Sequence, residues 1–119
     1  MVDLKKMKNV DITALLNKKF NDSKLKGIVA VAEKGSKLKE KPDKTLVESV
    51  SDLIEAVNEY DALLHLSPKE KQQWTEVRRQ QVLMERSPTT VEVGNYLSLI
   101  IVAVFVLRNA KAKVIAALS

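Results

Sequence analysis

The feature that most constrains this chain is its longest run without charge. Fifteen uncharged residues, most of them aliphatic, lie between Glu92 and Arg108. Such a run fits a membrane-spanning helix, a helix buried in a core, or a helix face that another protein covers. A spanning helix needs about 20 apolar residues, whereas this run is shorter and includes Gly94, Asn95 and Ser98. We therefore expect a helix buried on all sides in a helical domain and no membrane partner, and the other two interpretations stay open.

Two short motifs predict where helices begin. Ser67-Pro68 is followed by Glu70, and Thr89 is followed by Glu92. In each motif the hydroxyl can accept a backbone N–H at the start of the helix, and the Glu can accept the N–H of the capping residue. Such a capping box is typical of helices that begin in water.

The end of the apolar helix is predicted near Val106. The basic residues Arg108, Lys111 and Lys113 follow, and positive charge is favourable near a helix C-terminus. Residues 112–119 either extend this helix or form a short last helix.

Apolar spacing predicts a helix that begins near Thr45, with Asp43 or Thr45 as its cap. The stripe recurs at helical intervals and consists of Leu46, Val50, Leu53, Ile54 and Val57. Residues 3–20 show a weaker helical pattern.

Two segments of the N-terminal part are less regular. The short apolar run 26–33 fits a buried strand slightly better than a helical turn. Residues 33–44 contain Gly35, Pro42 and five Lys, which predicts an exposed Lys-rich loop. We expect one mainly α domain over residues 1–119, with a short strand region near its N-terminus.

Positive charge is concentrated at the start of the chain. Residues 1–44 carry twelve Lys and six acidic residues, whereas residues 45–119 carry eight Lys or Arg and nine acidic residues. A basic segment can attract RNA or an acidic protein, although a solvated surface fits the same pattern. The candidate nucleic-acid-binding residues are Lys37, Lys39, Lys41 and Lys44.

No motif for catalysis, metal binding or cofactor binding stands out. The chain has no Cys and a single histidine, His65, which lies between two leucines. Neither a His-based triad nor a Cys/His metal site can be assembled from these residues. We therefore expect a cytoplasmic protein that is not an enzyme and uses no cofactor, with His65 as a structural or loop residue.

The candidate partner-binding residues are Trp74, Arg78 and Arg79. A Trp on a helix face is either part of the core or an interface anchor. Adjacent Arg side chains can bind carboxylates bidentately, or they can form surface ion pairs with Glu76 or Glu85.

The segment "EYDALLHLSPKEKQQWTEVR" resembles a stretch in glutathione-transferase-like domains, closest to those of tRNA-synthetase-associated scaffold proteins. The residues that carry the resemblance are Leu63, Leu64, Ser67, Glu70 and Trp74. "PTTVEV" is similar to the capping box of the buried central helix in that family, and Ser51 and Ile54 match a Ser-x-x-Ile stretch. The resemblance covers about residues 45–107. Val50 departs from the family, because glutathione-binding members carry Glu or Gln there.

This resemblance implies a reduced glutathione-transferase-like fold without glutathione chemistry. It implies a module that docks to an aminoacyl-tRNA synthetase or a related translation factor, with tRNA handled elsewhere or through the basic surface. A small basic RNA-binding protein is the alternative, and self-association stays open.

Overall fold

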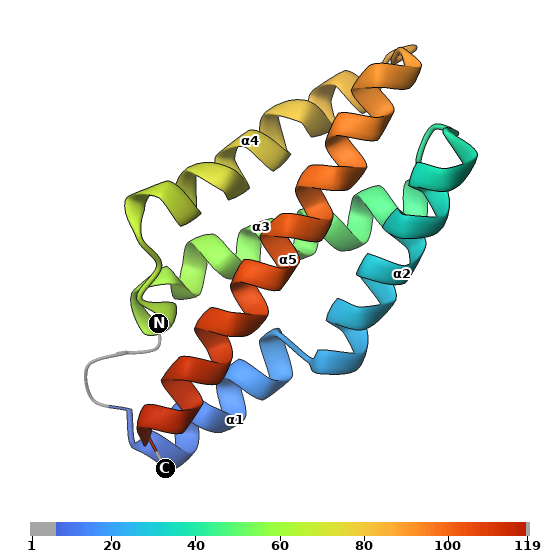
Figure 1. The fold of residues 1–119 in the computed structure, drawn as a ribbon. Helices are drawn as coiled ribbons and strands as arrows, with labels where there is room; N and C mark the ends of the chain where they lie inside the picture. Colours follow the sequence, from blue (N-terminus) through green and yellow to red (C-terminus); the bar gives the residue numbers. More distant parts are fainter. Residues whose placement is uncertain (1–6, 119) are drawn as a thin grey trace.

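A computed structural model describes residues 7–118, and this part of the chain forms five helices and no strand. The mainly α fold class is therefore confirmed. The bundle measures 46 × 23 × 22 Å. In Figure 1, α5 crosses the molecule in front of α3, with α2 and α4 on either side of it. The helices are α1 (Asn9–Lys19), α2 (Asp22–Leu38), α3 (Lys44–Leu64), α4 (Pro68–Met84) and α5 (Thr90–Leu118).

Helix α5 is the centre of the bundle because it contacts each of the other four helices. Eight of its residues are buried: Val93, Tyr96, Leu97, Ile100, Ala103, Val104, Leu107 and Lys111. The prediction of burial on all sides is wrong, since Val102 and Phe105 are both 48% exposed. The helix also continues past the predicted end near Val106, to Leu118. Residues 112–118 therefore extend it.

The predicted helix starts are confirmed. The Ser67 Oγ accepts the Glu70 N–H (3.1 Å) while Glu70 accepts the Ser67 N–H (2.9 Å). Thr89 and Glu92 repeat both bonds, at 3.2 and 2.9 Å. At the start of α3 it is Asp43 that caps, accepting the Leu46 N–H at 2.8 Å. These bonds satisfy N–H groups that have no partner inside the helix.

The strand predicted for residues 26–33 and the first half of the predicted loop 33–44 are wrong. Both lie in α2, which buries Leu25, Ile28, Val29 and Ala32 on one side. Only residues 39–43 connect α2 to α3. Gly35 is a packing residue and not a turn residue, because a Cβ there would lie 3.1 Å from Leu97 Cδ1.

The weak helical pattern of residues 3–20 is confirmed from Asn9 to Lys19 as α1, and residues 1–6 lie outside the described residues. The junction between α1 and α2 is held by a lysine of α5. Lys111 is 4% exposed, and its Nζ donates to the Phe20 carbonyl (2.7 Å) and to Asp22 Oδ1 (3.2 Å). Lys111 was predicted to follow the end of a helix, and the structure instead places it inside α5. Its charge satisfies the carbonyl that follows the last turn of α1.

Candidate functional site

The structure corrects the prediction of Trp74 as a partner-binding residue. Trp74 is 1% exposed and belongs to the core. Its indole Nε1 is buried without a hydrogen-bond partner among the described residues, as is the Tyr96 hydroxyl. Burial raises the pKa of Tyr96 to about 12; the nearby Gln81 amide opposes this shift but lies outside bonding geometry. The Tyr96 hydroxyl therefore stays protonated at neutral pH.

Arg78 and Arg79 are both exposed on α4, on what we call the α4 outer face. Arg79 Nε donates to Glu76 Oε2 at 2.8 Å, so the predicted surface ion pair with Glu76 is confirmed. The hydrogen bonds from Arg79, and then from Gln80, lower the pKa of Glu76 to about 2. The α4 outer face consists of Thr75, Arg78, Arg79 and Val82, all exposed.

Arg78 differs from its neighbour because no ion-pair partner accompanies it among residues 7–118. One turn further along α4, Val82 is 52% exposed. An unpaired guanidinium beside an exposed apolar side chain is a combination typical of protein interfaces, where Arg is enriched. The α4 outer face therefore keeps two of the three predicted partner-binding residues in an accessible position.

The four candidate nucleic-acid-binding lysines lie near the junction of α2 and α3, and all are exposed. Lys41 Nζ donates to the Arg86 carbonyl at 3.1 Å, and Lys44 pairs with Glu48 at 3.8 Å. The acidic residues Glu40 and Asp43 stand in the same segment. In the described part of the chain, the side chains of Lys37 and Lys39 have no hydrogen-bond or ion-pair partner. Because acidic residues alternate with these lysines, the positive charge of this segment is interrupted by negative charge.

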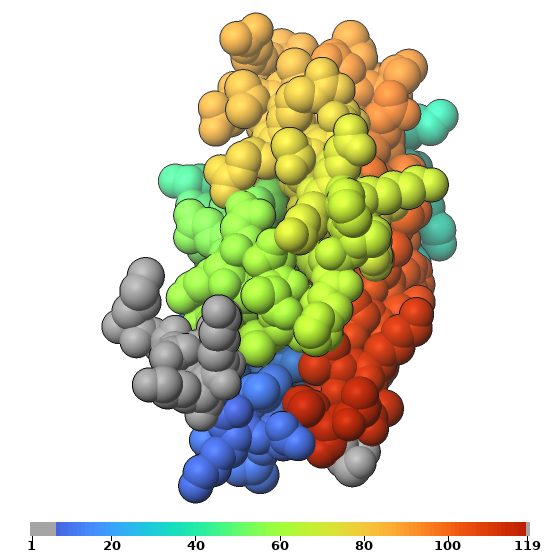
Figure 2. Space-filling view, turned by 90° about the vertical axis from the view of Figure 1, so that its left-hand side faces the viewer, coloured from blue at the N-terminus to red at the C-terminus, as the bar shows by residue number. Residues whose placement is uncertain are grey.

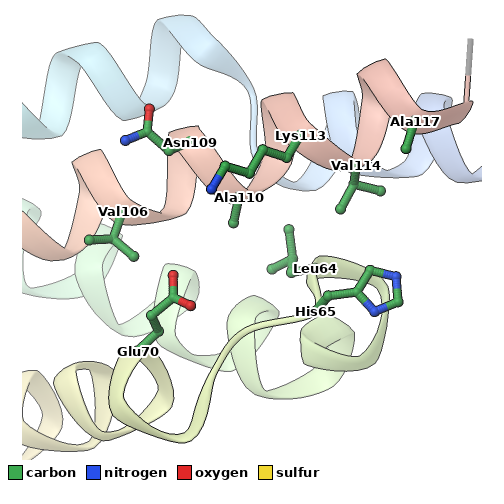
Figure 3. Close-up of a pocket in the computed structure, with 9 residues that line it drawn as sticks. All are labelled: Leu64, His65, Glu70, Val106, Asn109, Ala110, Lys113, Val114 and Ala117. Atoms are coloured by element: carbon green, nitrogen blue, oxygen red, sulfur yellow. The ribbon is translucent and has the colours of Figure 1, made fainter.

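A shallow hollow of about 350 Å³ lies between the α3–α4 junction and the second half of α5. In Figure 3, Glu70 extends from the start of α4 toward α5, while the His65 ring lies at one side of the hollow. His65 ends α3 with a left-handed backbone (φ 52°), which confirms it as a loop residue. The apolar side chains that line the hollow are Leu64, Val106, Ala110, Val114 and Ala117. The hollow can hold an apolar side chain of modest size, and the sequence motifs had not indicated it.

The side of α5 that faces away from the bundle is a second accessible surface, and sequence reasoning missed it. We call it the α5 outer face; it consists of Asn95, Ser98, Val102, Phe105, Asn109 and Ala112. In Figure 2 the orange-to-red α5 runs along the right-hand edge of the molecule. The sequence signal that could have revealed this face is that its four polar or small residues and the apolar Val102 and Phe105 together follow one another at intervals of three and four positions.

Helix α5 is, within residues 7–118, the one helix long and apolar enough to cross a membrane. Only 39% of its most apolar 18-residue segment is buried in the bundle. Its buried side is covered by the other four helices, as in the core helix of a helical domain.

Among the side chains of residues 7–118, no group of three or more His, Cys, Asp or Glu is arranged so that it could hold a metal ion. Comparisons with protein-family models, with curated proteins and with solved structures each found no match.

Proposed function

We propose that this chain is a cytoplasmic, non-catalytic protein-interaction module that docks through the α4 outer face. The observation that supports the proposal is Arg78, an exposed guanidinium without an ion-pair partner among the described residues, one turn from the 52% exposed Val82. Arg79 is less available because Glu76 already holds it. The face is suited to a partner that presents a carboxylate beside an apolar patch.

The rigid support of this face also favours a docking role. Trp74 and Val77 hold the inner side of α4 in the core, at 1% and 0% exposure. Gln81 Nε2 donates to the Val47 carbonyl and to Ser51 Oγ, both at 2.8 Å, which fixes α4 against α3. A helix held in this way presents its outer side chains without a large ordering cost on binding.

The resemblance to synthetase-associated glutathione-transferase-like domains makes an aminoacyl-tRNA synthetase or a related translation factor the proposed partner. Two residues of that resemblance, Ser67 and Glu70, form the capping box that starts α4. The resemblance concerns the helical half of that fold. The sheet of its thioredoxin-like half has no counterpart in residues 7–118.

RNA binding through Lys37, Lys39, Lys41 and Lys44 is the less supported alternative. The ion pair of Lys44 and the neighbouring acidic residues reduce the positive potential available to a phosphate backbone. An RNA complex would lose affinity steeply as salt is raised. Salt-dependent RNA binding that disappears in a Lys37→Ala/Lys39→Ala variant would favour this alternative over docking.

The docking proposal is tested by purifying the tagged full chain from native cells at low salt and identifying bound proteins by mass spectrometry. We expect a synthetase or translation factor that is lost from the Arg78→Glu variant and retained by the control Lys26→Glu, an exposed charge change on α2. Thermal unfolding checks that both variants keep the fold. Capture that is equal for the two variants, or the absence of any translation protein, would contradict the proposal.

A further inference from the structure

The α5 outer face carries no ionised side chain, although 29% of the residues in this chain are charged. Its residues from Asn95 to Ala112 follow one another at alternating intervals of three and four, which is the spacing of a coiled-coil seam. At its middle, Val102 and Phe105 are both 48% exposed. With a rise of about 1.5 Å per residue, the face is about 25 Å long.

We propose that this face binds the same face of a second copy of the chain, with the two α5 helices antiparallel. The symmetry axis then passes between Val102 and Phe105, so that Val102 of one copy lies opposite Phe105 of the other. By the same register, Ser98 of one copy lies opposite Asn109 of the other. A hydroxyl and an amide can bond to each other there, and the apolar pair fills the centre.

The charges at the edges of the face favour the antiparallel arrangement. Lys113 is exposed and has no ion-pair partner among the described residues. In the proposed register Glu92 of one copy lies level with position 115 of the other, so Lys113 of that copy is offset from Glu92 by only about 3 Å along the helix axis. Both residues lie on the same flank of α5. Glu92 uses Oε1 for its cap, which leaves its second oxygen free to accept.

A parallel arrangement would instead bring Lys113 of one copy toward Arg108 of the other, because opposite flanks of the two helices meet across a parallel seam, and these like charges repel. The polar residues argue against a lipid occupant, because Asn95, Ser98 and Asn109 would be dehydrated in hydrocarbon without partners. A second copy supplies partners for Ser98 and Asn109. Charge and polarity together therefore favour self-association of this face over insertion into a lipid surface.

One helix pair is a small interface, below the area of most stable complexes, so we expect a dissociation constant on the order of micromolar. Sedimentation equilibrium of the full chain should show a monomer–dimer mixture that shifts with protein concentration. Phe105→Ser should weaken the dimer at least about tenfold, since it removes the central aromatic contact twice. The matched variant Val31→Ser, on an exposed apolar residue of α2, should leave the dimer unchanged.

The register is tested with single cysteines, because the chain has none of its own. Ser98→Cys and Asn109→Cys variants, mixed and mildly oxidised, should form the mixed disulfide in preference to either homodisulfide. Ser23→Cys, on α2, is the control for random oxidation. Parallel pairing would yield the two homodisulfides instead and would overturn the proposed register.

The proposal would be overturned by a chain that stays monomeric at concentrations on the order of 100 μM. It would also be overturned by a dimer that Phe105→Ser does not weaken, or by a monomer that binds neutral lipid vesicles through Phe105. The docking proposal is tested independently of the dimer proposal. Arg78→Glu should leave the dimer intact, and Phe105→Ser should leave capture of the translation partner intact.

Discussion

Helices α4 and α5 begin with the same capping-box motif but differ in composition and in which of their residues are buried. Each starts with a capping box in which a hydroxyl and a Glu exchange hydrogen bonds with the backbone. Helix α4 is polar, yet it supplies the largest buried side chain, Trp74. Helix α5 is apolar, yet it buries a lysine and exposes a phenylalanine. The average composition of a helix therefore does not determine which of its residues are buried. The position of each residue relative to the neighbouring helices does.

The largest expected difference between α4 and α5 is seen when Trp74 and Phe105 are each replaced by alanine. Trp74→Ala should lower the free energy of unfolding by about 3–5 kcal/mol, because it opens a cavity in the core. Phe105→Ala should change it by about 0.5 kcal/mol or less, since half of the ring is already in water. Urea unfolding at a protein concentration low enough to keep the chain monomeric measures both. Comparable losses for the two variants would show that α5 is covered on its outer face as well.

The next effect concerns the buried lysine. Lys111→Met should cost about 1–3 kcal/mol of stability, because the Phe20 carbonyl loses its donor inside the protein. Asp22→Asn is the control, and its effect should be small because Asp22 is 68% exposed. Thermal and urea unfolding of both variants provide the measurement. If Lys111→Met is as stable as the parent chain, the lysine does not hold the α1–α2 junction.

A smaller effect tests the feature that the two helices share. Ser67→Ala and Thr89→Ala should each cost about 1 kcal/mol, since each removes the acceptor for one N–H at a helix start. We expect similar losses in the polar and the apolar helix, because a cap acts locally. Thr89→Ala should also leave partner capture unchanged. A much larger loss for one of them would mean that its hydroxyl has a role beyond the cap.

The smallest effect appears on acidification. The Thr89 backbone N–H, and then the Thr89 hydroxyl contact, lower the pKa of Glu92 below its usual value of about 4.3. The ionised form therefore stabilises the fold above pH 4.3, and this contribution is lost as the pH falls through the lowered pKa. The Glu76 carboxylate, which is hydrogen-bonded to Arg79, has a pKa of about 2 and should therefore titrate at a lower pH than Glu92. NMR titration of the carboxyl carbons measures both, and Glu92→Gln should remove the first step. A Glu92 pKa at or above 4.3 would contradict the cap geometry.

Local chemistry explains what the sequence predicted well. The two capping boxes and the Asp43 cap involve residues three positions apart, so the bonding pattern can be recognised without knowing the fold. The apolar stripe of α3 is similarly local, because its period is that of the helix itself.

Long-range packing explains the errors. The run 26–33 is short enough to fit a strand or a helix, and its contact with α5 decides for the helix. Gly35 suggested a turn, but it permits the close approach of Leu97, a residue 62 positions away in the sequence. The burial of Trp74 and the exposure of Phe105 likewise depend on how α4 and α5 are turned toward their neighbours. The spacing within each helix indicates a face, but it does not show which face is turned toward the other helices.

The central position of α5 has a consequence for how the chain is made. A ribosome adds about 5–20 residues per second from the N-terminus, so α5 emerges after the four helices that it holds together. Until then the apolar sides of α1 and α2, including Leu16, Leu25 and Ile28, have no α5 to pack against. We therefore expect the five-helix bundle to complete its core only after α5 has been synthesised.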